Sequence, residues 1–344
     1  MRQSIVSHPV TRRRSSAITC AWTAIAALGA ALHGPAGAAA PAWTPEKSVE
    51  LVVPSGTGGG NDKTVRVMQQ LMQQYKLINV STAVINKPGG GQAVTYAYLK
   101  QHAGDGHVLA SATMNMLTNR IMGTNPVSYR DLTPIVQLTR YYLTFVVRAE
   151  SPIQTFKDVE ARLRADPQSV TFGISTGAFP AITTGMVGVA LGIEPKYVKR
   201  VVFRGGGEVM SSLLGGHVDV VAGASASVLP HARSGKIRII GVSAPQRLGG
   251  PFAEVPTIKE QGVNVVSSNW YNLVGPPGLT AAQVGYWESI FEKVTATEEW
   301  KKELARNVWE DVFLKGPELT RALQEQEKEL AAVLKAMGQA KQMP

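Results

Sequence analysis

Residues 49–62 read Val-Glu-Leu-Val-Val-Pro-Ser-Gly-Thr-Gly-Gly-Gly-Asn-Asp, and this stretch indicates the fold class of the chain. Val49–Val53 is an apolar run of strand length. The glycine-rich turn after it leads into a pattern of apolar residues at helical spacing, from about Asp62 to Gln74. A buried strand, a turn and an amphipathic helix form one βα unit, from which parallel sheets covered by helices are built.

The same alternation continues along the chain in two sets. Further strands of the first set are expected at residues 80–85 and 107–112. A second set begins near Tyr142, and its expected strands are residues 143–147, 170–174, 201–203, 218–221 and 237–242. After Pro256 the pattern changes. Residues 270–274 are expected to return as a strand to the first set, and long amphipathic helices follow.

Two sets of this kind predict an α/β protein with two lobes. Each lobe is expected to hold a doubly wound, mainly parallel sheet flanked by helices. We expect residues 39–142 plus 256–344 to form lobe 1, and residues 143–255 to form lobe 2.

The N-terminus has the pattern of a secretion signal. A basic patch at Arg12–Arg14 precedes an apolar stretch from about Ala17 to Leu32, and Ala36-Gly37-Ala38 fits a cleavage site. The apolar stretch has about 16 residues, fewer than the roughly 20 that span a bilayer, so a retained membrane anchor is the less favoured alternative. We expect residues 1–38 to be a signal peptide cleaved near Ala38, and the mature protein to lie in the periplasm.

Composition excludes several classes of function. The single cysteine, Cys20, lies in the expected signal, so the mature chain has no disulfide and no thiolate metal site. Loss of the four arginines of residues 1–38 lowers the formal net charge from +10 to +6. The remaining basic residues are spread along the chain, unlike those of nucleic-acid binders. A mildly basic field still helps to recruit an anionic solute.

The turn after Val53 is the most informative candidate for a binding site. Its glycines let the backbone approach a ligand closely, and the following helix start offers free N–H groups and a positive dipole end to an anion. Asn61 or Asp62 also fits a helix cap, which is compatible with binding. A phosphate loop is disfavoured, because Thr57 and Asp62 stand where that motif needs glycine. The candidate contacts here are Ser55, Thr57, Gly58, Gly59, Asn61 and Asp62.

A second glycine-rich turn, Pro88–Gln92, also joins an expected strand to a helix. Two such turns at the carboxyl ends of neighbouring parallel strands mark the place where open α/β sheets bind ligands. From this turn and from the end of the third strand, the candidate contacts are Gly90, Gly91, Gln92, Ala93 and Thr113.

The stretch Gly173–Gly177 matches the nucleophile pattern G-x-S-x-G. Asp219 and His231 follow Ser175 in the order used by some hydrolases, so a secreted serine hydrolase is the enzyme alternative. Against it, no oxyanion segment of the His-Gly-Gly-Gly type precedes the motif. Taken instead as a binding loop, the turn offers the Ser175 and Thr176 hydroxyls and its backbone N–H groups to a ligand.

Other residues of the second half are weaker candidates. Arg204 follows a strand end, where a planar guanidinium suits a carboxylate, although a surface arginine fits equally well. Trp270 and Tyr271 fit a cleft wall or the core about equally, and Asn269 beside them would give a cleft wall a polar group. His217 and His231 have no partner at metal-ligand spacing, so no metal site is expected.

Several short motifs follow one another in a fixed order. They are Val53–Asp62, Asn86–Gly91, Asp105-Gly106, Phe203–Gly205, Leu213–Asp219, Leu229–Arg238 and Val255–Thr257. In that order and spacing, the chain from about Val49 to Gly338 resembles the substrate-binding proteins of tripartite tricarboxylate transporters, also called the Bug family.

The resemblance implies a type II periplasmic binding protein with a hinge, no enzymatic activity and no cofactor. It implies that a small organic carboxylate is held between the lobes, largely by backbone N–H groups of the two glycine-rich turns and by ordered water. It also implies delivery to a membrane permease with one large and one small subunit. We expect a monomer that does not bind nucleic acid and that closes by hinge motion near residues 143–147 and 243–256. The remaining candidate contacts are Ser175, Thr176, Gly177, Phe179, Arg204, Ser225, Asn269 and Trp270.

The chain departs from the family pattern at three places. Ser55 replaces a usual aromatic residue, Gln92–Tyr96 replaces a stretch like G-N-I-G-T, and Gly223–Ser227 replaces D-N-x-P-S. Together with Phe179, the space at Ser55 makes an aromatic or bulky carboxylate as compatible with the sequence as a short dicarboxylate.

Overall fold

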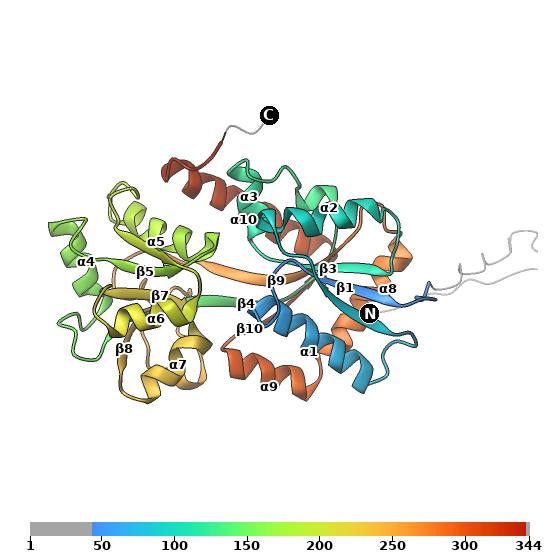
Figure 1. Ribbon diagram of the computed structural model, residues 1–344, viewed down its shortest axis with the longest axis horizontal. Helices are drawn as coiled ribbons and strands as arrows, with labels where there is room; N and C mark the ends of the chain where they lie inside the picture. The colour runs from blue at the N-terminus through green and yellow to red at the C-terminus, as the bar shows by residue number, and fades with distance from the viewer. Residues whose placement is uncertain (1–42, 342–344) are drawn as a thin grey trace, which may run out of the picture. The chain divides into compact units, whose positions relative to one another are not determined.

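The computed structural model describes residues 43–341, which form two sheets flanked by helices (Figure 1). The expected signal peptide of residues 1–38 lies outside the described residues. Among residues 43–341, no helix combines the length and the apolar character that crossing a bilayer requires.

The first sheet has parallel strands at one edge and antiparallel strands toward the other. β1 (Val49–Val53) pairs in parallel with β2 (Thr82–Asn86) and with β3 (Val108–Ala112). β9 (Ser268–Gly275) then pairs antiparallel with β3 and with β4 (Thr133–Arg148). The short β10 (Glu310–Lys315) also pairs with β4 in antiparallel orientation. The expected strand at 270–274 does return to this sheet, as β9.

The second sheet repeats this plan. β5 (Phe172–Ser175) pairs in parallel with β6 (Arg200–Phe203) and β7 (Val220–Ala224). The last part of β4 pairs antiparallel with β7 and with β8 (Ile237–Val242). The two-lobed α/β fold is therefore confirmed, and β4 and β9 add antiparallel pairs that the strand pattern did not indicate.

β4 belongs to both sheets. Its 16 residues pair with β9 as far as Tyr142 and with β7 and β8 from Leu143 onwards. Figure 1 shows β4 and β9 running together through the centre of the described chain. The division of the chain at residues 142/143 and 255/256 stays a proposal.

Helices cover both faces of the first sheet. The side chains of β1 alternate between the two faces, so apolar residues of this strand pack under the helices on each face. Leu51 and Val53 pack with Met68 and Met72 on one face, whereas Val52 packs in the cluster that holds Tyr96 on the other. The helices are α1 (Gly60–Gln74), α2 (Ala93–Gln101), α3 (Asn115–Ile121), α4 (Phe156–Ala165), α5 (Ala178–Ala190), α6 (Gly206–Leu214), α7 (Ser225–Arg233), α8 (Ala281–Thr295), α9 (Glu298–Asn307) and α10 (Gly316–Ala336).

The last helix, α10, packs against elements of both sheets. Its leucines at 319, 323, 330 and 334 are buried, and it contacts α3 and α5 (Figure 1). Beyond its end, the thioether of Met337 lies against Gly185 of α5, where a Cβ would be 2.5 Å from the methionine Cε. This helix therefore packs against α3, which follows a strand of the first sheet, and against α5, which follows a strand of the second.

Candidate ligand-binding site

A cavity of about 360 Å³ opens where the loops after β1, β3, β5 and β7 converge beside β4 and β9. We call it the cleft cavity. It is lined by Ser55, Gly59, Gly60, Asn61, Gln92, Thr113, Asn115, Tyr141, Leu143, Ser175, Thr176, Gly177, Ala178, Phe179, Pro180, Ala222, Gly223, Ala224, Asn269 and Tyr271. It thus lies at the carboxyl ends of the parallel strands of both sheets, the expected place for a ligand in this fold class.

The N-terminus of α1 faces the cleft cavity without a side-chain cap. Within the described part of the chain, the N–H groups of Gly60, Asn61 and Asp62 have no acceptor, because hydrogen bonds to the loop carbonyls begin only with Lys63. Asn61 is 7% exposed, lines the cavity and has a buried, unpartnered side-chain oxygen. The buried hydroxyl of Ser55 also lacks a partner. Polar groups left open at a cavity wall are typical of a ligand or water site.

Asp62 is turned away from the cleft cavity and holds the loop together instead. Its carboxylate accepts hydrogen bonds from the Gly58 N–H at 2.9 Å, from Asn86 Nδ2 at 2.9 Å and from Arg66 Nε at 3.0 Å. Burial alone raises the pKa of Asp62, but these hydrogen bonds outweigh it and lower the pKa to about 2. Thr57 joins the same network through Asn86, at 3.4 Å. Of the candidates in this turn, Ser55, Gly59 and Asn61 line the cavity, and Thr57, Gly58 and Asp62 do not.

The second glycine-rich turn reaches the cleft cavity through one residue, Gln92. Gly90, Gly91 and Gln92 have φ values of 54°, 59° and 82°, a left-handed run that turns the chain sharply before α2. Gln92 Nε2 donates to Thr113 Oγ1 at 2.9 Å, and both residues line the cavity. Gly90, Gly91 and Ala93 are not among the lining residues; the Gly91 carbonyl accepts a hydrogen bond from Asn119 Nδ2 instead.

The loop after β5 supplies the opposite wall. Ser175, Thr176, Gly177 and Phe179 all line the cavity. Gly177 takes a φ of 123° and leads into α5, which also begins without a side-chain cap. The Thr176 hydroxyl donates to the Arg204 carbonyl at 3.2 Å, so it can only accept from a ligand while that bond persists.

Three further candidate residues also lie outside the cleft cavity. Arg204 is exposed, and its N–H donates to Glu208. Ser225 is buried and shares a 2.8 Å hydrogen bond with Thr144 Oγ1. Trp270 is buried, and its indole N–H donates to Gln326 Oε1.

Asn269, in contrast, lines the cavity and organises its floor. Its side-chain oxygen accepts from the N–H groups of Met114, at 3.1 Å, and Trp270, at 2.8 Å. Its Nδ2 donates to the Tyr141 hydroxyl at 2.8 Å.

Two tyrosines line the cleft cavity: Tyr271, for which the sequence left cleft wall and core equally open, and Tyr141, which the sequence patterns did not single out. The rings of Tyr141 on β4 and Tyr271 on β9 stack with centroids 5.2 Å apart. Burial raises the pKa of Tyr271 to about 12 and holds the pKa of Tyr141 well above its ordinary value, so both phenols stay neutral. The other lining residues that were not expected are Gly60, Asn115, Leu143, Ala178, Pro180 and Ala222–Ala224.

The electrostatic character of the site follows from this composition. Among residues 43–341, those that line the cleft cavity include no aspartate, glutamate, lysine, arginine or histidine. Its polar groups are neutral hydroxyls and amides together with two uncapped helix starts, whose N–H groups carry partial positive charge. Such a site suits an anion, whereas a cation would find no carboxylate to neutralise it.

The arrangement does not form a hydrolase triad. β5 and β7 are parallel, and Asp219 lies just before β7, where its carboxylate accepts from the Thr171 N–H at 2.8 Å. Ser175 lies at the other end of β5, about 13 Å away along an extended strand. His231 is in the last turn of α7, away from that helix's N-terminus at the cavity. The G-x-S-x-G turn is therefore a loop of the cleft wall.

Comparison with known proteins places the chain in a family. Residues 65–339 match the model of the tripartite tricarboxylate transporter family receptor. The chain belongs to this receptor family. A family member of Cupriavidus necator, described as a UPF0065 protein in the gbd 5' region, is 30% identical over 323 residues, covering 92% of this chain and 95% of the relative. The family consists of solute receptors, so this receptor is not an enzyme.

Solved structures share the fold of this receptor. The periplasmic binding protein BugD has a TM-score of 0.71 at 20% identity and covers 87% of this chain and 100% of its own. Rpa4515 of R. palustris, solved with adipate, has a TM-score of 0.72 at 22% identity, and the match covers 86% of this chain and 98% of Rpa4515. MatC of Rhodopseudomonas palustris, solved with malate, has a TM-score of 0.68 at 21% identity, and the match covers 84% of this chain and 99% of MatC.

Proposed function

We propose that this receptor captures a small organic carboxylate in the cleft cavity and delivers it to membrane subunits of a tripartite tricarboxylate-type transporter. The observation that carries the proposal is the uncapped start of α1. Its free N–H groups at residues 60–62 face a cavity whose lining, among residues 43–341, includes no charged side chain. An anion satisfies these donors and gains from the helix dipole.

The ligand is expected to bridge the two sheets. One carboxylate oxygen pair meets the start of α1, and the far end of the molecule meets the loop of Ser175–Phe179, which begins α5. Phe179 is 4% exposed and packs edge-to-face on Tyr141, so it offers an apolar surface to the carbon chain of the ligand. Closure about β4 completes the enclosure, because this strand is common to both sheets.

The comparisons with known proteins support the class of ligand and the receptor role in this proposal. The adipate and malate complexes of structurally similar proteins support a carboxylate as the class of ligand. The family description supports a receptor role beside a transporter.

Residues 1–38, with their basic and apolar segments, are proposed to direct export to the periplasm. We propose that the receptor acts there as a monomer.

Isothermal titration calorimetry with pairs of ligands tests the proposal. Each pair is a mono-, di- or tricarboxylic acid, or an aromatic acid, together with its neutral amide. We expect at least one acid to bind and its amide to bind at least about tenfold more weakly, because the amide lacks the charge that the helix start favours. Equal affinity for an acid and its amide would contradict the proposal.

A further inference from the structure

A second cavity adjoins the cleft cavity, and Tyr271 is one of four residues that line both. This second cavity, of about 290 Å³, is called the side cavity here. Tyr271, Tyr141, Gly60 and Ala224 line both cavities, whereas Asn307 lines the side cavity alone. Tyr271 has the largest side chain of the four together with Tyr141, and it belongs to the boundary between the candidate ligand site and the side cavity.

Tyr271 is held firmly in this position. Its ring stacks on Tyr141, with an interplanar angle of 26°, and meets the Trp309 ring edge-on, with centroids 5.2 Å apart. Its hydroxyl lies against the backbone at the start of α1, where a Cβ on Gly60 would be 2.5 Å away. The side chain is 7% exposed. Because Tyr141, Trp309 and the start of α1 all contact this side chain, the ring moves only if one of these neighbours moves.

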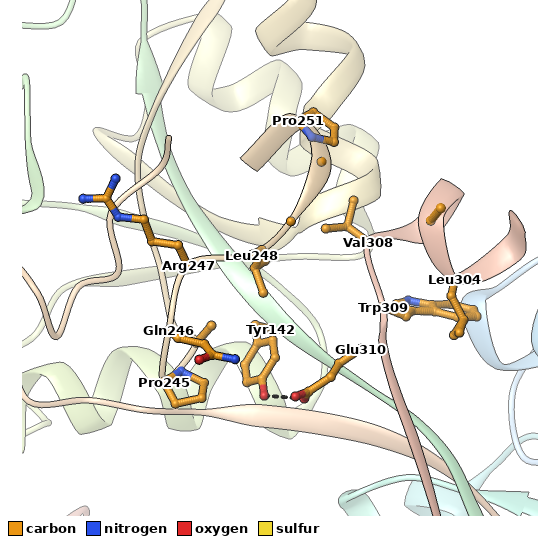
Figure 2. Close-up of a pocket in the computed structure, with 14 residues that line it drawn as sticks. Tyr142, Pro245, Gln246, Arg247, Leu248, Pro251, Leu304, Val308, Trp309 and Glu310 are labelled. Atoms are coloured by element: carbon orange, nitrogen blue, oxygen red, sulfur yellow. Dashed lines mark hydrogen bonds between the residues drawn. The ribbon is translucent and has the colours of Figure 1, made fainter. Parts of the chain in front are cut away.

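The space behind Tyr271 extends further. Tyr142, Val308 and Trp309 line both the side cavity and a third cavity of about 380 Å³. Figure 2 shows this third cavity, with Val308 and Trp309 on one side and the Tyr142 hydroxyl hydrogen-bonded to Glu310. A ligand that passed the position of Tyr271 would therefore enter the side cavity, which adjoins the third cavity at Tyr142, Val308 and Trp309.

We propose that Tyr271 sets the upper size limit of the carboxylate that the receptor accepts, by closing the side cavity to the ligand. This inference rests on the proposed function, since it assumes a carboxylate at the start of α1. With Tyr271 present, the carbon chain of the ligand is confined to the cleft cavity and directed toward the loop after β5. Without the ring, the two cavities merge beside the anchoring N–H groups, and a longer chain gains a second place to lie.

The test is a length series of linear dicarboxylates, from malonate to sebacate, titrated into the wild-type receptor and into Tyr271→Ala and Tyr271→Phe. We expect Tyr271→Ala to raise the ratio of the suberate to the succinate association constant by at least about tenfold, as one or two methylenes in an apolar pocket do elsewhere. Tyr271→Phe keeps the ring, so this ratio should stay within about twofold of wild type even if overall affinity falls with the lost hydroxyl.

Two further variants complete the test, one as a substitute for the alanine variant and one as a control. Tyr271→Leu removes less volume and should shift the ratio in the same direction if the alanine variant does not fold, as judged by circular dichroism. Asn307→Ala enlarges the side cavity alone and should leave the ratio at the wild-type value. An unchanged ratio in the folded alanine and leucine variants overturns the size limit alone. Failure of the wild type to bind any member of the series or any of the acids tested above overturns the carboxylate function, and the size limit with it.

Discussion

The Ser243 hydroxyl donates a hydrogen bond of 2.7 Å to the Ser267 carbonyl, and the Ser267 N–H donates one of 2.9 Å to the Ser243 carbonyl. The same hydroxyl accepts from the Leu143 N–H at 3.0 Å. Both serines are buried. These bonds join β4, at the residue where it leaves the first sheet, to both ends of the segment that connects β8 with β9. The two places where the chain crosses between the sheets are thus tied at one point.

Removal of the Ser243 hydroxyl is expected to destabilise the receptor. Ser243→Ala leaves the Leu143 N–H and one bond of the Ser267 carbonyl unsatisfied in a buried place, which costs about 1–3 kcal/mol of the free energy of unfolding. Urea denaturation measures this loss. Ser234→Ala removes an exposed hydroxyl and should change the free energy by less than about 0.5 kcal/mol. Equal stability of the two variants would show that the Ser243 junction contributes nothing.

Ligand binding is expected to close the two lobes about this junction. Small-angle scattering of the receptor, with and without a saturating carboxylate identified by calorimetry, should show a smaller radius of gyration in the bound state. The cleft cavity is open to solvent between the loops of both sheets, so closure brings these loops together. An identical radius of gyration in both states would argue against a hinge mechanism.

Stability is expected to fall in acid through Asp62. Because folding lowers the pKa of Asp62 from 3.8 to about 2, its charged form stabilises the folded state above pH 4, and this contribution disappears as the pH falls from about 4 to about 2. The shift in the pKa corresponds to about 2 kcal/mol of the free energy of unfolding. Asp62→Asn should be less stable than wild type at pH 7, and the difference should shrink toward pH 2. A difference that stayed constant over this range, in urea denaturation at several pH values, would contradict the ionic role.

Asn61 and Arg204 are expected to differ sharply in their effect on binding. Asn61 lines the cleft cavity, where its Nδ2 can donate to a carboxylate, so Asn61→Ala should weaken the binding of a carboxylate about tenfold. Arg204 is exposed and outside the cavity, so Arg204→Ala should change affinity less than about twofold. Calorimetry measures both affinities, and melting temperatures check that both variants are folded. A larger loss for Arg204→Ala would assign the anion to the arginine instead.

A methyl group at Gly60 is expected to disturb the site directly. Its Cβ would lie 2.5 Å from the Tyr271 hydroxyl, so Gly60→Ala must displace that ring or the start of α1. Affinity for a carboxylate should fall at least about tenfold. Gly285→Ala, on α8, has no atom within 4 Å of its new Cβ and serves as the matched control. Binding that survived Gly60→Ala unchanged would place the ligand elsewhere.

Local patterns predicted the elements and the first loop of the site well. Apolar periodicity located β1 and α1 to within two residues. The start of α4 is just as local, because its capping box joins Thr155 to Asp158, where each side chain bonds to the other's backbone. These features depend on contacts within a few residues, which is why a sequence reveals them.

Features that depend on strand pairing were not predictable in the same way. Tyr141 and Tyr271 meet because β4 and β9 pair antiparallel in one register, and no periodicity within either strand indicates its partner. Asn61 and Asp62 are neighbours in the first turn of α1, and their side chains point to different sides of it. Which of them faces the cavity depends on the angle at which α1 leaves the sheet, so the sequence named both as candidates.

The neutral lining of the cleft cavity has a consequence for the release of the ligand. A receptor that grips an anion with lysine or arginine must leave a bare cation in a desolvated place when the anion departs, and that cost slows the departure. Here the groups at the wall are backbone N–H donors, hydroxyls and amides, all of which water can satisfy in turn. Among the described residues, the cavity wall therefore carries no formal charge of its own, and solvent alone can replace the solute when it leaves.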